Sequence, residues 1–314
     1  MRTIFFGTPS LVLPCLRAVA AAHEAVAVVC RPDSPQGRSK KLVPPPAKVC
    51  AEELGIPVHQ PEKLNDGTFE AWLRSMAPDL CVVFAYGRLL KQPILDVPAK
   101  GWLNVHPSLL PKYRGPSPIQ SAILHGETET GVSIMDVVLE MDAGGILLQE
   151  TTPIDPDDTS ETLGERLAEM AAPLLVEGMN QVAAGTAVFT PQDPARVTTC
   201  PLFEKEHGRI AWDRSAEEIR NLVRAAQPWP VAQCRLRGEV YRVHRAAVLE
   251  EPAPESPGTI TGVDKERFRV ATGRGQLVVE VFQAPGKKAL PVSEFLKGRR
   301  LEAGEQFEDM HACP

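Results

Sequence analysis

Three polar residues in this chain could act together on one small chemical group, because their spacing allows their side chains to converge. Asn104 and His106 stand two residues apart, so if residues 103–106 end a strand, both side chains leave the same face of it. Asp142 must arrive from elsewhere in the chain. A predicted strand at residues 132–138 leads into the turn 140–145, whose paired glycines allow a tight path that could bring the carboxylate back to His106.

An amide, an imidazole and a carboxyl group together suit the transfer of a formyl group to an amine. Such a transfer passes through a tetrahedral intermediate that carries an oxyanion and an ammonium. Asn104 and a protonated His106 can both donate hydrogen bonds to the oxyanion, each worth on the order of 3 kcal/mol when well placed. Asp142 would favour the imidazolium and could accept the amine proton, directly or through water, so this chemistry needs no metal ion.

Apolar runs alternate with helical patterns over the first half of the chain. Residues 3–6, 25–30 and 80–85 are predicted strands, and residues 48–55 and 69–76 are predicted helices. This alternation predicts an α/β fold with a Rossmann-like, doubly wound and mostly parallel sheet, in a catalytic domain of residues 1–189. Ligands of such sheets bind beyond the carboxyl ends of the strands, where Ala85, His106 and the Asp142 loop are expected.

The pattern changes in the second half. Residues 159–184 are strongly helical, and the proline-rich stretch 190–207 is interpreted as an interdomain linker. After a helix at 216–226, short alternating runs follow at residues 233–236, 240–248, 258–263, 268–271 and 277–282. Five or six short strands in this space predict a smaller antiparallel β-barrel like the oligonucleotide-binding (OB) fold, in a domain of residues 208–314.

The composition limits the protein class. No window approaches the roughly 18 uninterrupted apolar residues that a membrane span needs, and the start of the chain is too short an apolar run for a secretion signal, so we expect a cytoplasmic protein. Seven dispersed cysteines without a CxxC pair argue for buried reduced thiols over disulfides or a zinc site. The net charge of -6 is not typical of a protein that binds nucleic acid over its whole surface, although basic residues slightly outnumber acidic ones from Gly208 onward.

The sequence around these residues resembles the formyltransferase family that uses 10-formyltetrahydrofolate. The resemblance rests on motifs spread over nearly the whole chain, namely Ile4-Phe-Phe-Gly-Thr-Pro9, Gly37-Arg-Ser-Lys-Lys-Leu42, Val83-Phe-Ala-Tyr-Gly87, Asn104-Val-His106-Pro-Ser-Leu-Leu-Pro111, Arg114-Gly115-Pro116, Gly131-Val-Ser-Ile-Met135, Met141-Asp-Ala-Gly-Gly145, Gln283-Ala-Pro-Gly-Lys-Lys288 and Phe295-Leu-Lys-Gly298. It implies that the catalytic asparagine, histidine and aspartate of the family fall on Asn104, His106 and Asp142. Three positions depart from the family pattern, Pro107, Ser117 and Met141, and none of them removes a catalytic group.

The resemblance also implies a pocket for 10-formyltetrahydrofolate, the formyl donor. Its expected residues, many acting through backbone groups, are Phe84, Tyr86, Gly87, Arg88, Leu89, Leu90, Ser108, Leu109, Leu110, Pro111, Leu139, Glu140 and Met141. The loop 139–142 would cover the pterin. Leu89 and Leu90 have an equally good structural interpretation as helix core, and a turn or cap role is the favoured interpretation of Ser108.

The acceptor implied by the resemblance is the α-amino group of methionine on charged initiator tRNA. The segment 31–48 carries five basic residues against one aspartate and no apolar period, so it is either a solvated loop or a loop that contacts phosphates. By resemblance this loop reads the acceptor stem, with Arg38 as the wedge and Lys40 and Lys41 beside it. In the C-terminal domain, Lys287 and Lys288 are the favoured phosphate contacts.

Other functions stay open at this point. An enzyme of the same fold could formylate a small amine, such as glycinamide ribonucleotide or an amino sugar nucleotide, and the protein could instead bind RNA without catalysis. Nucleotide binding at Gly7-Thr-Pro9 is disfavoured, because neither the three-glycine fingerprint nor the Walker lysine is present. The sequence shows no obvious additional apolar surface that could pair two copies of the chain, so we expect a monomer.

Overall fold

The computed structural model describes residues 1–36 and 41–310, which divide into two compact units. Unit 1 comprises Met1–Pro118, Glu129–Pro153 and Gly164–Pro201. Unit 2 comprises Ile119–Thr128, Ile154–Leu163 and the described residues from Leu202 onward. Within residues 1–36 and 41–310, no helix combines the length and apolarity that a membrane span requires.

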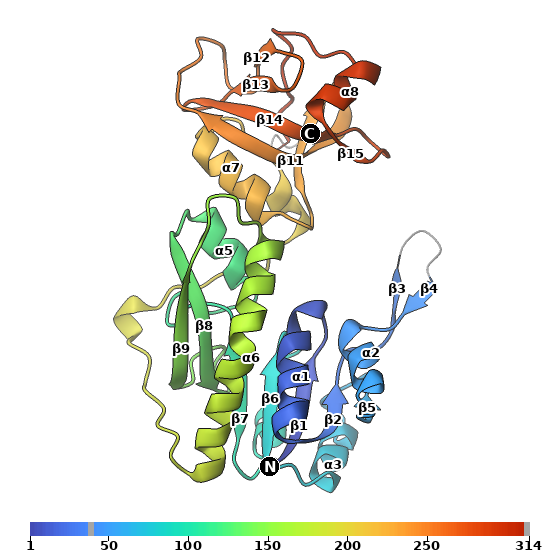
Figure 1. Ribbon diagram of the computed structural model, residues 1–314, viewed down its shortest axis with the longest axis vertical. Coiled ribbons are helices and arrows are strands. Elements are labelled where there is room, and N and C mark those ends of the chain that lie inside the picture. Colours follow the sequence, from blue (N-terminus) through green and yellow to red (C-terminus); the bar gives the residue numbers. More distant parts are fainter. Residues whose placement is uncertain (37–40, 311–314) are drawn as a thin grey trace. The chain divides into compact units, whose positions relative to one another are not determined.

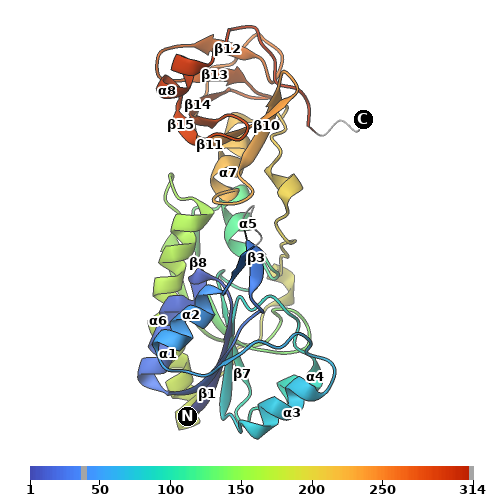
Figure 2. The ribbon, with the colours of Figure 1, turned by 90° about the vertical axis from the view of Figure 1, so that its right-hand side faces the viewer.

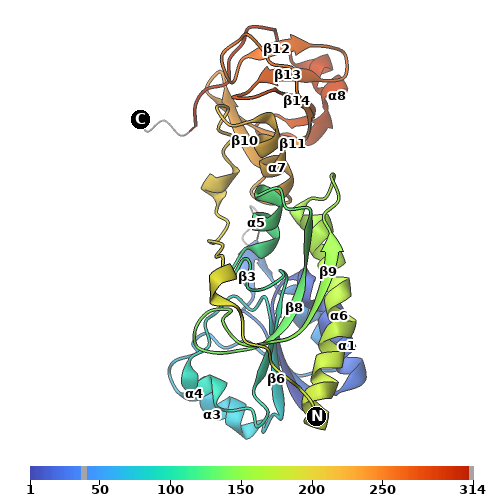
Figure 3. The same ribbon diagram turned by 90° about the vertical axis from the view of Figure 1, so that its left-hand side faces the viewer.

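The main sheet of unit 1 has seven strands within the described residues, in the order β5-β2-β1-β6-β7-β8-β9. Their bounds are β1 Arg2–Gly7, β2 Glu24–Val29, β5 Val58–His59, β6 Leu80–Phe84, β7 Trp102–His106, β8 Glu129–Asp136 and β9 Ile146–Pro153. The strands from β5 to β7 pair in parallel, whereas β8 and β9 continue the sheet as antiparallel strands beside β7 (Figure 1). Figure 3 shows β8 and β9 side by side. The predicted mostly parallel sheet is therefore confirmed, and its last two strands make it a mixed sheet.

Helices cover both faces of this sheet, as a doubly wound fold requires. The helices of this part of the chain are α1 Leu13–Ala22, α2 Pro46–Glu53, α3 Thr68–Ser75, α4 Gln92–Leu95 and α6 Ser160–Ala184. Helices α1, α2 and α6 lie on one side of the strands, and α3 and α4 lie on the other (Figure 2). In the core that includes Phe69 of α3, the ring centroid of buried Phe6 lies 6.1 Å from that of Phe69 and 4.8 Å from that of Trp102.

The basic segment 31–48 contains a short hairpin that the sequence analysis did not predict. Strands β3, Ser34–Gln36, and β4, Lys41–Val43, pair with each other in an antiparallel register (Figure 1). Each strand is only three residues long, so it offers no apolar alternation that periodicity could detect. The short helices α4 and α5, Pro118–Leu124, and strand β9 also escaped prediction.

Six of the seven cysteines lie in the described residues, and all six are buried. Burial raises the pKa of the Cys15 thiol to about 12 and that of Cys30 to about 11. These thiols therefore stay protonated at neutral pH, as the sequence predicted for packing residues.

Unit 2 contains an antiparallel sheet with the strand order β10-β11-β14-β13-β12, and β15 also pairs with β14. From Leu202 onward, its elements are the 3₁₀ turn Lys205–Gly208, α7 Ala216–Ala225, β10 Ala232–Leu236, β11 Glu239–Leu249, β12 Ile260–Val263, β13 Phe268–Ala271, β14 Gln276–Gln283, β15 Ala289–Pro291 and α8 Val292–Gly298. The predicted runs 233–236 and 268–271 fall on β10 and β13 almost residue for residue. The antiparallel β domain is confirmed.

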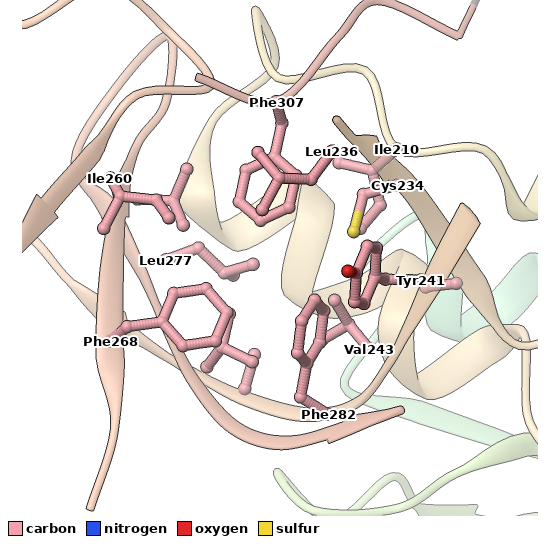
Figure 4. Packing of buried hydrophobic residues seen from close by; sticks show 14 of the residues in the cluster. Ile210, Cys234, Leu236, Tyr241, Val243, Ile260, Phe268, Leu277, Phe282 and Phe307 are labelled. Carbon is pink, nitrogen blue, oxygen red and sulfur yellow. The ribbon is translucent and has the colours of Figure 1, made fainter. Parts of the chain in front are cut away.

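The core of unit 2 is aromatic. The side chain of Phe282 is fully buried, and its ring centroid lies 5.0 to 5.2 Å from those of Tyr241, Phe268 and Phe295 (Figure 4). Edge and offset ring contacts of this kind add to the apolar area that each ring buries. The helix α7 begins with a capping box, in which Ser215 and Glu218 each satisfy a backbone N–H of the other.

We expect Phe282→Ala to lower the free energy of unfolding of unit 2 by about 3–5 kcal/mol, because the change leaves a cavity among the three aromatic rings around it. Thermal or urea denaturation of the whole protein measures the loss. The matched control is Leu290→Ala, which truncates a side chain that is 39% exposed on β15 and should change stability little. Equal effects of the two variants would contradict this description of the core.

Candidate active site

Strand β7 positions Asn104 and His106 as the sequence predicted. Asn104 pairs in register with Val83 of β6 and Met135 of β8, and His106 pairs with Ser133. Because residues two apart on a strand share a face, both side chains project from the same side of the sheet near the carboxyl end of β7. His106 is 4% exposed, so its ring is surrounded by protein.

The loop between β8 and β9 returns Asp142 to this strand. The backbone of Asp142 has φ +52°, in the left-handed region that L residues seldom adopt. Its carboxylate accepts hydrogen bonds from Asn104 Nδ2 at 3.3 Å and from the backbone N–H of Gly115 at 2.8 Å. The same carboxylate lies 3.7 Å from His106 Nδ1. The structure thus brings the three predicted side chains together around one point.

The tautomer of His106 follows from its hydrogen bond to a backbone carbonyl. Nε2 lies 2.9 Å from the carbonyl oxygen of Tyr113, which can only accept, so Nε2 carries the proton and donates it. Nδ1 is then the nitrogen that faces Asp142. Burial lowers the pKa of His106 below its ordinary value of 6.5, and the Asp142 carboxylate and the Tyr113 carbonyl raise it by less. Asp142 thus favours the imidazolium, as the sequence analysis expected, but burial outweighs it and favours a neutral ring in the resting site.

The segment 113–115 carries both backbone groups that touch the site. Tyr113, with φ +61°, offers its carbonyl to His106, and Gly115 offers its N–H to Asp142. At Gly115, with φ +125°, a Cβ would lie 2.3 Å from the carbonyl oxygen of Cys200, so only glycine fits there. Sequence reasoning noted the glycine motif and could not foresee these two backbone contacts.

Residues of the predicted linker also support the site. Thr198 accepts from Arg114 N through its carbonyl and from Tyr113 N through its hydroxyl, both at 2.9 Å. Cys200 N donates to Arg114 O at 2.8 Å, and Gln192 donates to the carbonyl of Asp142 at 2.8 Å. The segment 190–201 belongs to unit 1, and no apolar period or motif in the sequence signalled these contacts.

The first predicted folate segment follows strand β6. Phe84 and Tyr86 are buried, Gly87 has φ +78°, and Leu89 is 73% exposed. The side chain of Arg88 is held by intramolecular hydrogen bonds, since its guanidinium donates to the carbonyls of Pro61 and Glu62, both at 2.9 Å. Leu89 is therefore a surface side chain and not the helix core that was its alternative reading, and Leu90, packed against the α3-side core, is half-buried.

A hollow of about 260 Å³ lies beside this segment. It is lined by Glu62, Lys63, Leu64, Asn65, Arg88, Leu89 and Lys91. A larger hollow of about 520 Å³ lies in unit 2, near the start of α7, and its lining contains no residue predicted for the site.

The second predicted folate segment, 108–111, is fixed by polar contacts. Ser108 is fully buried, and its hydroxyl donates to the carbonyl of Lys112 at 2.7 Å, as befits the turn residue that the sequence suggested. Ser133 donates to the carbonyl of Ser108 at 2.6 Å and accepts from the N–H of Leu110 at 3.1 Å. Leu110 and Pro111 are buried, and Leu109 is half-buried.

The third predicted folate segment lies on the Asp142 loop. Leu139 is 64% exposed and Met141 is 50% exposed, although both are large apolar side chains, and Glu140 forms an ion pair with Arg114 at 3.3 Å. Exposed apolar side chains in a loop next to polar catalytic groups are the surface that an aromatic ligand would cover. Among the described residues, no group of three or more metal-ligating side chains is arranged to hold a metal ion.

Comparisons with known proteins identify the family of this chain. A family model described as formyl transferase matches residues 1–179, and a second, described as formyl transferase, C-terminal domain, matches residues 203–300.

The chain belongs to the formyltransferase family.

A curated relative from Moorella thermoacetica, named methionyl-tRNA formyltransferase, is 44% identical over 306 residues, which cover 97% of this chain and 98% of the relative. Among solved structures, HypX from Aquifex aeolicus in complex with tetrahydrofolic acid has a TM-score of 0.63 at 20% identity, and the match covers 97% of this chain and 50% of HypX. Methionyl-tRNA formyltransferase from Clostridium thermocellum has a TM-score of 0.56 at 16% identity, covering 79% and 93% of the two chains. The two structures share the formyltransferase fold with this chain.

The residues predicted to bind tRNA are only partly described in this formyltransferase. Arg38 and Lys40 lie outside the described residues, and Lys41 is an exposed residue of β4. Lys287 and Lys288 are exposed in the turn between β14 and β15, and among the described residues no acidic side chain pairs with either of them. By contrast, Arg245 is paired with Glu280 at 2.7 Å and Arg299 with Glu239 at 3.1 Å.

The buried, neutral His106 makes the stability of the protein depend on pH. Because its pKa is lowered in the folded state, the unfolded state binds more protons as the pH falls below 6.5. The stabilisation is fully present above that pH and is lost as the pH falls through the lowered pKa. We therefore expect His106→Gln to lose less stability than the wild type between about pH 7.5 and pH 5.5 in urea denaturation. Identical losses in the two proteins would contradict the buried, neutral assignment.

Proposed function

We propose that this formyltransferase transfers the formyl group of 10-formyltetrahydrofolate to the α-amino group of methionyl-tRNA, and that its acceptor is the initiator species. The product is N-formylmethionyl-tRNA for the initiation of translation. The observation that carries this proposal is the convergence of Asn104, His106 and Asp142 at the carboxyl end of β7, in a chain that matches a methionyl-tRNA formyltransferase over 97% of its length.

We assign catalysis to these three side chains. The methionyl nitrogen forms a bond to the formyl carbon, the bond from that carbon to the donor nitrogen breaks, and one proton passes from the amine to the donor nitrogen. One N–H of Asn104 binds Asp142, which leaves its second N–H to stabilise the oxyanion of the intermediate. Asp142, with a side chain that is 15% exposed, accepts the amine proton directly or through water.

Under this proposal, His106 acquires its proton during the reaction from the amine, by way of Asp142 or water, and releases it to the donor nitrogen when the bond from that nitrogen to the formyl carbon breaks. Its Nε2–H is committed to the Tyr113 carbonyl, so Nδ1 is the position that can take up a proton beside Asp142. A developing oxyanion raises the pKa of a neighbouring imidazole, which offsets the lowering that burial imposes in the resting site. The protonated ring then donates from Nδ1 to the oxyanion.

The formyl donor is held, in this proposal, by the three segments named from the sequence. Backbone groups of residues 84–90 and 108–111 recognise the pterin, and the exposed Leu139 and Met141 cover it. The apolar faces of these side chains fit a flat aromatic ring system, and the buried hydrogen bonds of Ser108 and Ser133 keep the second segment in place.

The tRNA-facing residues are proposed to be the basic segment and the turn of unit 2. Arg38, Lys40 and Lys41 would contact the acceptor stem, with Arg38 as the wedge. Arg31, at the start of this segment, lies beside the predicted folate segment, because its guanidinium nitrogen lies 3.8 Å from the position that a Cβ on Gly87 would take. This supports a place for the basic segment near the formyl donor. Lys287 and Lys288 would contact backbone phosphates without reading sequence.

We propose the division into a catalytic domain of residues 1–189, a connecting segment 190–207 and a tRNA-binding domain of residues 208–314. We further propose that the second domain is an OB-like barrel. Residues near the C-terminus support closure, because Glu308 N donates to Arg235 O of β10 at 2.8 Å and Ile260 N of β12 donates to Glu305 O at 2.7 Å. One short segment thus contacts both edge strands. We also propose that the protein acts as a monomer in the cytoplasm, where charged tRNA is made.

A formylation assay with four acceptors tests the function. The protein is incubated with 10-formyltetrahydrofolate and charged initiator tRNA, charged elongator methionine tRNA, glycinamide ribonucleotide or an amino sugar nucleotide. We expect rapid formylation of the initiator species alone. Preferred formylation of a small amine would replace this proposal with the small-amine function of the same fold, and no formylation of any acceptor would favour a non-catalytic RNA-binding role.

Replacing Asp142 tests the catalytic assignment. We expect Asp142→Asn to lower the turnover number by several orders of magnitude while the melting temperature changes little, because the carboxylate acts on the transition state. Asp96→Asn, which alters an exposed carboxylate bonded to Gln92, is the matched control. Full activity of Asp142→Asn would refute the assignment.

Replacing Arg38 tests the role of the basic segment. We expect Arg38→Ala to raise the Michaelis constant for tRNA and to leave that for the folate donor unchanged, since the lost contact is with the acceptor stem. Arg74→Ala, which removes an exposed arginine paired with Glu70 on α3, is the control. An unchanged Michaelis constant for tRNA would count against the wedge.

A further inference from the structure

Gln192 connects two parts of the active site that are distant in sequence. Its side-chain Nε2 donates to the carbonyls of Asp142 and Gly144, both at 2.8 Å. Its Oε1 accepts from Arg114 Nε at 3.0 Å. The side-chain amide therefore donates twice to the loop that carries Asp142. It accepts once from the segment 113–115, which also contacts the Asp142 carboxylate.

Arg114 occupies a matching position on the other segment. It stands between Tyr113, whose carbonyl binds His106, and Gly115, whose N–H binds Asp142. Its side chain is 13% exposed, and its Nη1 lies 3.3 Å from Glu140 on the Asp142 loop. Gln192 and Arg114 thus form a bridge, from here on the Arg114–Gln192 bridge, that ties the loop to the residues around His106.

The loop needs such a support because its conformation is not one that a free chain favours. Asp142 has φ +52°, and an L residue in this region persists only where its surroundings hold it. Gly144 is confined as well, since a Cβ there would lie 2.0 Å from the carbonyl oxygen of Asp136. Gln192 binds the carbonyl of the strained residue itself and that of Gly144 two positions later.

We propose that Gln192 is a positioning residue for formyl transfer, which holds the Asp142 carboxylate against Asn104 and His106 through the Arg114–Gln192 bridge. The inference rests on the proposed function. Among the described residues, the side-chain hydrogen bonds of Gln192 go to the carbonyls of Asp142 and Gly144 and to Arg114, so it acts through the backbone of Asp142 and not on the reacting atoms. Catalytic groups displaced by as little as about 1 Å lose on the order of 100-fold in rate, so a loosened loop has a measurable cost.

The first test is a split between the kinetic constants. Gln192→Met keeps the length of the side chain and removes all three hydrogen bonds. We expect its turnover number to fall on the order of 10- to 100-fold, with the Michaelis constant for methionyl-tRNA within about twofold of the wild type. The control is Gln181→Met, the same exchange on α6. The side-chain amide of Gln181 donates to Glu177 at 3.3 Å on the exposed surface, so this variant should retain wild-type kinetics.

The second test asks whether Gln192 acts through Asp142. Single-turnover rates are measured for Gln192→Met, Asp142→Asn and the double variant. Residues that act as a unit are not additive, so we expect the double variant to be no slower than Asp142→Asn alone. Additive losses would show that Gln192 serves only general stability and would overturn the proposal.

A second variant guards against a failure to fold. Gln192→Glu retains the acceptor for Arg114 and removes the donors to the Asp142 loop, and it should reproduce the loss in turnover. Wild-type turnover in both Gln192 variants would overturn the positioning role and leave the proposed function intact. A wild-type protein that formylates no methionyl-tRNA would instead refute the proposed function, and this inference with it.

Discussion

The carboxylate of Asp142 accepts hydrogen bonds from two different segments of the chain. Asn104 approaches it from β7, and the Gly115 N–H approaches it from the loop that follows. Its own loop leaves β8 and adopts a left-handed residue at the turn. Because β8 runs antiparallel to β7, the loop that follows β8 starts away from the carboxyl end of β7 and must fold back toward it. The return of that loop is the constraint on which the whole site depends.

Burial of His106 and the placement of Asp142 work against each other in the resting protein. Removing the ring from water disfavours its charged form, and the nearby carboxylate does not fully compensate. The Tyr113 carbonyl then fixes the neutral ring with its free nitrogen toward Asp142. Under the proposed mechanism, this nitrogen is a proton acceptor that becomes a donor only when negative charge develops beside it. Such an arrangement favours the transition state over the resting state, which is the condition for lowering a barrier.

Much of this arrangement was predictable from local sequence. The two-residue spacing of Asn104 and His106 fixed their shared face once β7 was recognised, and the Gly144-Gly145 turn indicated how Asp142 could return. Strongly apolar strands such as β6 and regular patterns such as that of α6 were predicted within a few residues. In each of these cases the signal lies in side-chain type and period.

The remainder depends on backbone groups and long-range pairing, which leave no such signal. The contacts of the Tyr113 carbonyl, the Gly115 N–H and the main chain of Thr198 are made by backbone groups, which side-chain type does not reveal. Segment 190–201 lacks an apolar period because it contributes hydrogen bonds and not core, and for that reason it was interpreted as a linker alone. The hairpin of β3 and β4 escaped notice because its strands are short and largely exposed.

The most direct test of the account is a crystal structure of the protein with a stable analogue of 10-formyltetrahydrofolate. We predict that the formyl oxygen lies within about 3.5 Å of both Asn104 Nδ2 and His106 Nδ1, with the Asp142 carboxylate beside the formyl carbon. A formyl group bound out of reach of Asn104 and His106, with Asp142 still held by Gly115, would contradict the account.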